Sequence, residues 1–216
     1  MKNLQKIFSF WLIAVLFLPA TVFSQTHYPV SILPIPDFHV KALKGTYQKI
    51  EKISYQKGQI RIAFWGTENV YEMVKYRVKG LMVDEFPTMT VKTIHLNKET
   101  KEADLPTIDL FVWQVQNFKQ EKKRLKAWSK KQGAEQLILY FPENTSIADL
   151  NAKSRKKAMA FSKKVNFGFL DVPPNWNKYV DEHGLIQEEM FRRGKINDHG
   201  EYVIAGIIYQ YLMLPF

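Results

Sequence analysis

The chain has 216 residues, contains no cysteine and carries a formal net charge of +10 at pH 7. The missing cysteines exclude disulfides and lipid attachment through a cysteine thiol, so the stability of the fold must come from its buried core. The positive excess favours anionic partners such as acidic glycans, phospholipid headgroups or nucleic acid.

Residues 1–24 predict a cleaved export signal. Lys2 and Lys6 give a basic start, an apolar stretch runs from Ile7 to Leu18, and Ser24 is a small residue after which a signal peptidase could cut. The apolar stretch has 12 residues, whereas a membrane-spanning helix needs about 20, which argues against a membrane anchor. Cleavage would remove two lysines and lower the net charge from +10 to +8. We expect a secreted or periplasmic product without a transmembrane anchor, for which nucleic acid is the least expected partner.

Residues 25–57 are predicted to form an extended lead-in to a single domain that spans residues 58–216. Pro29, Pro34 and Pro36 lack an amide donor, and each biases the residue before it toward extended geometry. This segment should therefore wrap the domain rather than form a central strand.

Five short apolar runs, rich in β-branched and aromatic residues, predict strands at residues 60–65, 90–96, 109–115, 136–141 and 165–172. Helical periodicity separates them. One apolar face repeats every three or four positions through Val70, Met73, Val74, Val78, Leu81 and Met82. Narrower faces follow through Phe118, Leu125 and Trp128, and through Ile147, Leu150, Ser154, Ala158 and Phe161. The last helix, from about Glu201, is apolar almost all round and should be buried.

Strands that alternate with helices predict an α/β fold: a three-layer α/β/α sandwich with a five-stranded, mainly parallel sheet. Ligands of such sheets bind beyond the carboxyl ends of the strands. The residues expected in this crevice are Thr67, Glu68, Asn69, Asn97, Lys98, Gln116, Asn117, Asn144, Thr145 and the loop 173–195.

Two stretches of the chain resemble the SGNH (GDSL-type) hydrolase family. IRIAFWGTENVYEMVKYRVKGLMVDEFPTMTVKTIHLN (60–97) is similar to that family's opening strand, Gly-Asp-Ser turn, helix and second strand. FLDVPPNWNKYVDEHGLIQEEMFRRGKINDHGEYVIAGIIYQYL (169–212) resembles its closing strand, Asp-x-x-His segment, Asn-Asp-x-Gly turn and final helix. The resemblance covers nearly all of residues 58–213 and implies a flavodoxin-like strand order.

The resemblance also implies where catalytic groups would stand, and they are missing. Gly66 matches the turn glycine, but Thr67 takes the place of the aspartate and Glu68 the place of the nucleophilic serine. Arg193 replaces the aspartate that orients the base, and Lys195 stands where the histidine segment would be. A serine nucleophile needs a base within hydrogen-bonding reach, so acyl transfer by this route is not expected.

The resemblance also matches Gly194, Asn197 and Asp198 to the framework of the family's closing segment, and it matches Asn117, with an offset of one residue, to a Gly-x-Asn segment that binds an oxyanion. Where nucleophile and base would have met, we predict an ion pair between Glu68 and either Lys195 or Arg193. A structural alternative stays open for the turn, because Thr67 or Asn69 could simply cap a helix whose positive end Glu68 favours.

Other polar residues also have two interpretations. His199 could pair with Asp198, but Asn197 or Asp198 is expected to cap the terminal helix. The other histidines are scattered, so no metal site and no cofactor is predicted. Trp176 and its aromatic neighbours Tyr179 and Phe191 could line a binding groove or pack over the sheet.

The basic residues gather on two predicted helices, at 119–131 and 153–164. Such a run is usually a solvated helix face, and an anion-attracting surface becomes the better interpretation if the two helices are neighbours.

These observations favour an exported, degenerate SGNH-like protein that binds an acylated glycan, a lipid or another anionic ligand without turnover. The expected ligand-binding residues are Gly66, Thr67, Glu68, Asn69, Asn117, Trp176 and Lys195. Two alternatives remain open: an ester hydrolase with Thr67 as nucleophile and His199 or His183 as base, and a non-catalytic adaptor of the cell envelope that works through the basic helices.

Overall fold

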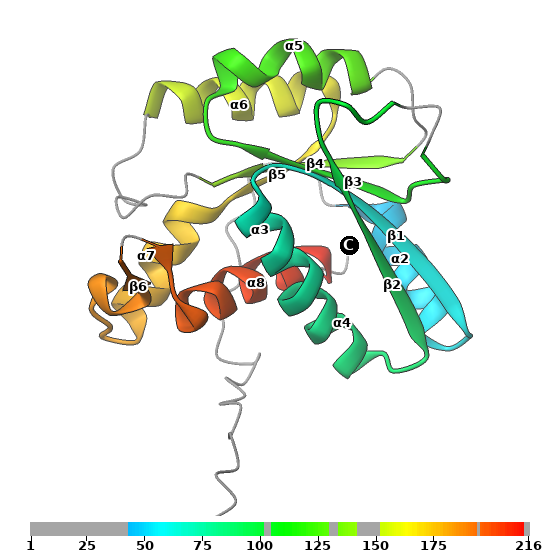
Figure 1. Ribbon diagram of the computed structural model, residues 1–216, viewed down its shortest axis with the longest axis horizontal. Helices are drawn as coiled ribbons and strands as arrows, with labels where there is room; N and C mark the ends of the chain where they lie inside the picture. Colours follow the sequence, from blue (N-terminus) through cyan, green and yellow to red (C-terminus); the bar gives the residue numbers. More distant parts are fainter. Residues whose placement is uncertain (1–42, 102–104, 130–133, 142–151, 194, 214–216) are drawn as a thin grey trace, which may run out of the picture.

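The computed structural model describes residues 43–101, 105–129, 134–141, 152–193 and 195–213. The predicted export signal and the proline-containing part of the lead-in lie outside these ranges. Within them, the chain forms a five-stranded sheet with helices on both faces (Figure 1).

The sheet has the order β2-β1-β3-β4-β5, and its four pairings are all parallel. This is the flavodoxin-like order, so the predicted fold class is confirmed. The strands are β1 (Gly58–Trp65), β2 (Met89–Leu96), β3 (Leu110–Val115), β4 (Glu135–Tyr140) and β5 (Gly168–Asp171).

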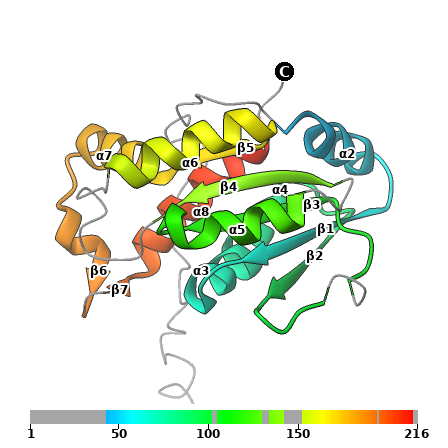
Figure 2. The same cartoon turned by 90° about the horizontal axis from the view of Figure 1, so that it is seen from above.

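One face of the sheet is covered by α3 (Glu68–Met73), the π-helical segment η2 (Val74–Val78), α4 (Lys79–Glu85) and α8 (Asp198–Leu212). The other face carries α5 (Phe118–Ser129) and α6 (Ala152–Val165), as Figure 2 shows from above. The remaining elements are α2 (Lys44–Ser54), α7 (Val172–Glu182), the 3-10 helix η4 (Gln187–Met190) and the hairpin β6 (Phe191–Arg192) with β7 (Lys195–Ile196).

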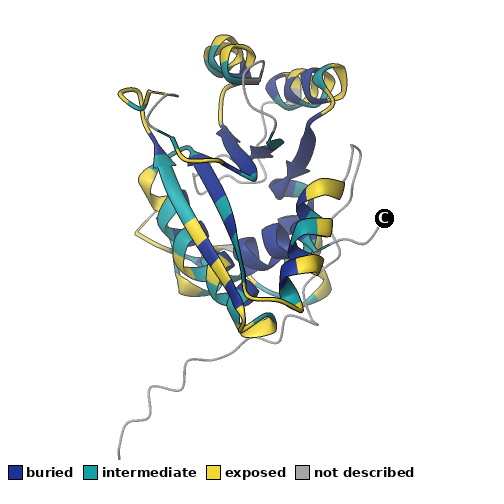
Figure 3. Ribbon diagram, turned by 90° about the vertical axis from the view of Figure 1, so that its right-hand side faces the viewer, coloured by how far each residue is buried: buried dark blue, intermediate teal, exposed yellow. Residues whose placement is uncertain are grey.

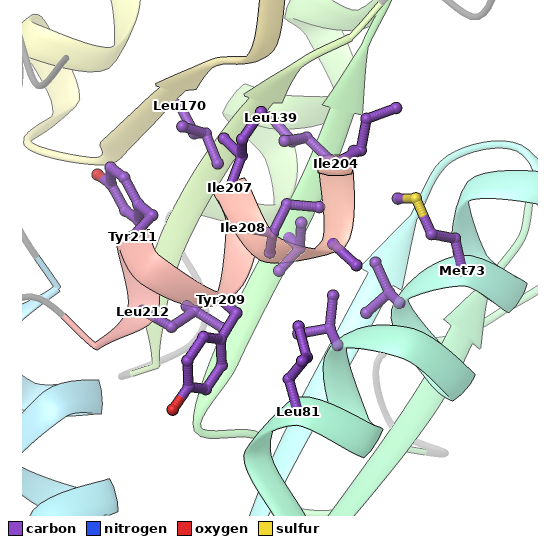
Figure 4. Close-up of a cluster of buried hydrophobic side chains, with 14 of the residues drawn as sticks. Met73, Leu81, Leu139, Leu170, Ile204, Ile207, Ile208, Tyr209, Tyr211 and Leu212 are labelled. Carbon is purple, nitrogen blue, oxygen red and sulfur yellow. The ribbon is translucent and has the colours of Figure 1, made fainter. Parts of the chain in front are cut away.

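Two cores result because successive strand residues point to opposite faces. Ile62 and Phe64 of β1 join the core beneath α8, whereas Ala63 joins the core beneath α5 and α6. Helix α8 is apolar nearly all round and lies against the sheet, with Ile204, Ile207 and Leu139 among the contacts drawn in Figure 4. The predicted burial of the last helix is confirmed.

The apolar face predicted for residues 70–82 is confirmed, since Val70, Met73, Val74, Val78, Leu81 and Met82 are all buried. Helices α3, η2 and α4 follow one another without a break from residue 68 to residue 85.

Three predicted segments differ in the structure. Residues 44–54 of the expected extended lead-in form helix α2, because Thr46, Ile50 and Ile53 recur at helical spacing and are buried. The expected loop 173–195 begins instead with helix α7, whose prolines stand in the first turn, where an amide donor has no helical partner. The last strand is limited to 168–171, because α6 continues to Val165.

The described residues include no helix with the length and apolar character that a bilayer crossing requires.

Candidate functional site

The turn after β1 requires a glycine for reasons of space. A Cβ on Gly66 would lie 2.4 Å from Oε1 of Gln114 and 2.6 Å from the ring of Phe64. The absence of a side chain therefore lets the Gln114 amide approach the turn closely. This supports the prediction of a strand-to-helix turn built on Gly66.

Gln114 holds this turn from the neighbouring strand β3. Its Oε1 accepts a hydrogen bond from the backbone N–H of Thr67 (2.8 Å) and another from the Thr67 hydroxyl (3.3 Å). Its Nε2 donates to the carbonyl of Phe141 (3.2 Å), after β4. Because Gln114 is buried, its amide needs these partners, and they tie together the carboxyl ends of three strands.

Glu68 begins α3 with its side chain 67% exposed, and its Oε2 lies 2.9 Å from Nδ1 of His95. The other ring nitrogen of His95, Nε2, lies 3.2 Å from the carbonyl oxygen of Gly66. Both nitrogens of this imidazole therefore face oxygen acceptors. The ring is held between the turn and the first residue of the helix.

The flat side of His95 is also occupied. Its ring stacks on Tyr71 of α3, with 4.4 Å between centroids and 8° between planes. The ammonium group of Lys75 lies 5.7 Å from the centroid of the same tyrosine ring. His95 is thus fixed by contacts to α3 as well as by its two nitrogens.

These groups lie on one face of the sheet. Alternate residues of a strand point to the same face of the sheet. In β2, Met89 and Val91 belong to the α8 core, and His95 continues this alternation. In β3, Leu110 and Val112 belong to the same core, and Gln114 continues theirs. We call the group Gly66, Thr67, Glu68, His95 and Gln114 the strand-end site. It stands at the point where the strand order reverses, between β1 and β3, where ligands of open parallel sheets bind.

The predicted ion pair is wrong. Glu68 pairs with His95, and the described part of the chain contains no ion pair between Glu68 and either Lys195 or Arg193. Both cations lie at the turn of the β6–β7 hairpin with exposed side chains, and Arg193 has a left-handed backbone (φ 53°). The sequence placed them opposite Glu68 only through the resemblance, whereas the pairing of β1 with β2 brings His95 to the turn.

Trp176 does not line an open surface. It is fully buried in the α8 core, and its ring centroid lies 5.9 Å from that of Phe191. A Cβ on Gly200 would lie 3.1 Å from the Trp176 ring, so this aromatic residue packs α7 against α8. Trp176 is therefore a packing residue of the core, which was the alternative interpretation, and its buried ring does not line a ligand-binding groove.

Two asparagines act as helix caps. Asn197 accepts a hydrogen bond from Gly200 N–H (3.1 Å) at the start of α8, which confirms the predicted cap. Asn117 accepts one through Oδ1 from Lys119 N–H (3.1 Å) at the start of α5.

Asn69 is exposed in α3 beside Glu68, and the crevice residues Asn144 and Thr145 lie outside the described residues.

The two histidines proposed as alternative bases are His183, which directly follows α7, and His199 in α8; both contact Tyr179. His183 stacks on Tyr179 at 4.2 Å between ring centroids, and His199 contacts the same tyrosine at 6.4 Å. Burial, followed by the charge of His183, lowers the pKa of His199. Their contacts are therefore with the α7–α8 packing, whereas the imidazole at the strand-end site is His95.

Asp171, at the end of β5, is a buried carboxylate paired with Arg155 of α6. The backbone carbonyl of Asp171 accepts a hydrogen bond from Nδ2 of Asn175 (2.8 Å). Burial raises the pKa of the nearby Tyr140. This pair joins α6 to the sheet at the same edge as the strand-end site, on the opposite face.

Sequence reasoning missed His95 and Gln114. Gln114 carried a usable signal, because it is a polar residue inside the apolar run LFVWQV. His95 stands one residue before the end of β2, beside Phe64 in the parallel register. The pairing of these two strands, which only the fold supplies, turns a scattered histidine into a neighbour of Glu68.

Among the residues that the structure describes, no three histidine, aspartate or glutamate side chains gather as a metal site would require. Comparison of the sequence with protein-family models gives no match, and comparison with curated proteins gives none either.

Proposed function

We propose that this protein is an exported, catalytically inactive relative of the SGNH hydrolases that binds an acylated glycan at the strand-end site. The observation that carries the proposal is the pair of Glu68 and His95 at the turn where the resemblance places a serine. At this turn the imidazole of His95 contacts the Glu68 carboxylate through one nitrogen and the Gly66 carbonyl through the other. Neither partner of the imidazole is a hydroxyl that could act as a nucleophile.

The hydroxyl nearest to this pair in sequence, on Thr67, also argues against acyl transfer. It donates to the neutral amide oxygen of Gln114, which is too weak a base to activate an alcohol. The same amide oxygen accepts the Thr67 backbone N–H, so the bond is part of the turn. Binding without turnover is therefore the better supported function.

The charge of the turn favours a glycan over the two other ligand classes. Glu68 is an exposed carboxylate, and a carboxylate accepts hydrogen bonds from sugar hydroxyls but repels an anion. Exposed Asn69 adds an amide with both donor and acceptor capacity beside it. Lipids and other anionic ligands suit this turn less well.

The proposal is tested by thermal unfolding with an O-acetylated oligosaccharide and with its deacetylated counterpart. Ligand at 100 times its Kd adds about 2.7 kcal/mol to the free energy of unfolding, which is a readily measured rise in Tm. We expect the acetylated sugar to raise Tm in the natural chain, and the rise to disappear in Glu68→Ala. The matched control Glu188→Ala removes an exposed carboxylate on η4, and the acetylated sugar should still raise the Tm of this variant.

Hydrolysis of p-nitrophenyl acetate separates the binding protein from an enzyme. We expect the protein to release p-nitrophenol from this ester no faster than buffer alone does. Turnover that disappears in Thr67→Ala or in His199→Ala would contradict the proposal and favour the esterase alternative.

A further inference from the structure

The charge of this molecule is concentrated on one layer. Helix α5 carries five basic residues and one acidic residue, and α6 carries six basic residues and no acidic one. Their net charge is therefore +10, equal to the formal charge of the whole chain. The opposite layer is different: residues 68–85 and 198–212 contain six acidic and three basic residues, a net charge of −3.

The two basic helices are neighbours. The rings of Phe118 on α5 and Phe161 on α6 are 5.3 Å apart, and the backbone N–H of Phe118 donates to Oγ of Ser154 (3.0 Å). Figures 1 and 2 both show them side by side over the same face of the sheet. The condition that favours an anion-attracting surface over two separate solvated faces is therefore met.

The lysines form two stripes on the outer side of these helices. Positions 119, 122, 123 and 126 of α5, and positions 153, 156, 157 and 164 of α6, recur at helical spacing, so each set shares one side of its helix. Figure 3 shows both helices at the top, buried toward the sheet and exposed away from it. We call the surface made by the exposed lysines the lysine face; it comprises Lys119, Lys122, Lys123, Lys126, Lys153, Lys156, Lys157, Lys163 and Lys164.

The two arginines of these helices are used internally. Arg124 lies 3.9 Å from the centroid of the Trp65 ring and pairs with Glu121, and Arg155 pairs with buried Asp171. The exposed cations are therefore all lysines. Lysine is a hydrated point charge on a flexible stem, whereas specific recognition of a single phosphate or sulfate favours the rigid fork of arginine.

The apolar residues of α5 and α6 face inward. Phe118, Leu125 and Phe161 are buried, and Trp128 packs edge-on against Phe111 and Trp113 of β3. The described part of the lysine face thus offers no aromatic platform for stacked bases or sugar rings and no large apolar side chain to insert into a bilayer. Its chemistry suits a broad, planar, anionic surface contacted through charge alone.

We propose that the lysine face docks the protein on the surface of a bilayer that contains anionic phospholipids. A lysine near such a surface contributes about 1 kcal/mol, so a few of the nine exposed lysines suffice for reversible binding. The attraction is screened within about 10 Å at 0.1 M salt, so binding falls as salt rises. The strand-end site lies on the opposite face of the sheet and remains open to solution, so this inference is independent of the proposed ligand.

The test is sedimentation of the full chain with phosphatidylcholine vesicles, with and without 30% phosphatidylglycerol. The variant carries Lys122→Glu, Lys126→Glu, Lys156→Glu and Lys157→Glu. The matched control carries the same charge change at exposed lysines elsewhere, through Lys52→Glu, Lys57→Glu, Lys79→Glu and Lys92→Glu. All three proteins share the N-terminal segment, so neutral vesicles measure its apolar binding, and the comparison of the variant with the control cancels any binding through Lys2 and Lys6.

We expect the natural chain to bind the anionic vesicles at 0.05 M salt and to leave them at 0.5 M. The variant should bind at least tenfold more weakly, and the control within about threefold of the natural chain. Circular dichroism checks that each protein is folded, and the pairs Lys122→Glu/Lys126→Glu and Lys156→Glu/Lys157→Glu replace the fourfold variant if it is not. Equal losses in variant and control, or binding to dextran sulfate but not to anionic vesicles, would overturn the proposal.

Discussion

Glu68 and His95, which are 27 positions apart in the sequence, meet at 2.9 Å at the carboxyl end of β1. The contact exists because β1 and β2 pair in parallel with Phe64 opposite His95, so the end of β2 lies beside the turn that begins α3. The imidazole is held further by the Gly66 carbonyl and by the Tyr71 ring.

The energetic coupling between Glu68 and His95 should be small. The Glu68 side chain is 67% exposed, and exposed ion pairs contribute less than about 1 kcal/mol. A double-mutant cycle with Glu68→Ala and His95→Ala, measured by urea unfolding, should give a coupling of about 0.5 kcal/mol. A coupling above about 2 kcal/mol would mean that the pair is shielded from water, contrary to its exposure.

Gly66→Ala should destabilise the fold by about 1–3 kcal/mol, because the added methyl group would overlap the Gln114 amide and the Phe64 ring. The comparison is Gly80→Ala, since a Cβ on Gly80 meets nothing within 4 Å and the residue lies inside α4. That change should stabilise by about 0.5–1 kcal/mol through helix propensity. Urea midpoints measure both, and equal shifts would show that the turn has room for a side chain.

Asp171→Ala should lower the free energy of unfolding by about 3 kcal/mol, because it leaves Arg155 without its buried partner. Glu182→Ala is the control, since its pair with Lys178 joins two side chains that are about half exposed. The control should change the free energy of unfolding by less than about 0.5 kcal/mol. Similar losses in both variants would indicate that the Asp171 pair is open to water.

The stability of the α7–α8 packing should depend on pH through His199. Burial, and then the charge of His183, lowers the pKa of His199 from its ordinary 6.5, so the unfolded chain binds this proton more readily than the folded chain does. The stabilisation that comes from burying His199 in its neutral form contributes fully to the free energy of unfolding above pH 6.5, and it is lost as the pH falls below this value. The decrease in Tm between pH 7 and pH 5 should therefore be smaller in His199→Asn. An unchanged decrease would assign the acid sensitivity to other groups.

The strands and helices were largely predictable, because each apolar run or stripe must be buried. The run at 60–65 and the face from Val70 to Met82 predicted β1 and the α3–α4 segment correctly. Two features with a local signal also followed from the sequence: the Asn197 cap of α8 and the turn after β1, although the side chains that leave no room at Gly66 include Gln114 of the neighbouring strand β3. Helix α7 was missed because its prolines indicated a loop, although the first helical turn tolerates them.

The partners of each polar group were decided by tertiary structure. Residue spacing alone could not show that Glu68 faces His95 rather than Lys195, because the choice depends on which strands are neighbours and in which register. The same holds for Trp176, whose burial depends on the packing of α7 against α8, and for the lysine face, which exists because α5 and α6 lie side by side. The sequence by itself determined the charge, the periodicities and hence the layers. Only the folded chain determined which side chains from distant segments meet, because hydrogen bonds and ion pairs act over a few ångströms.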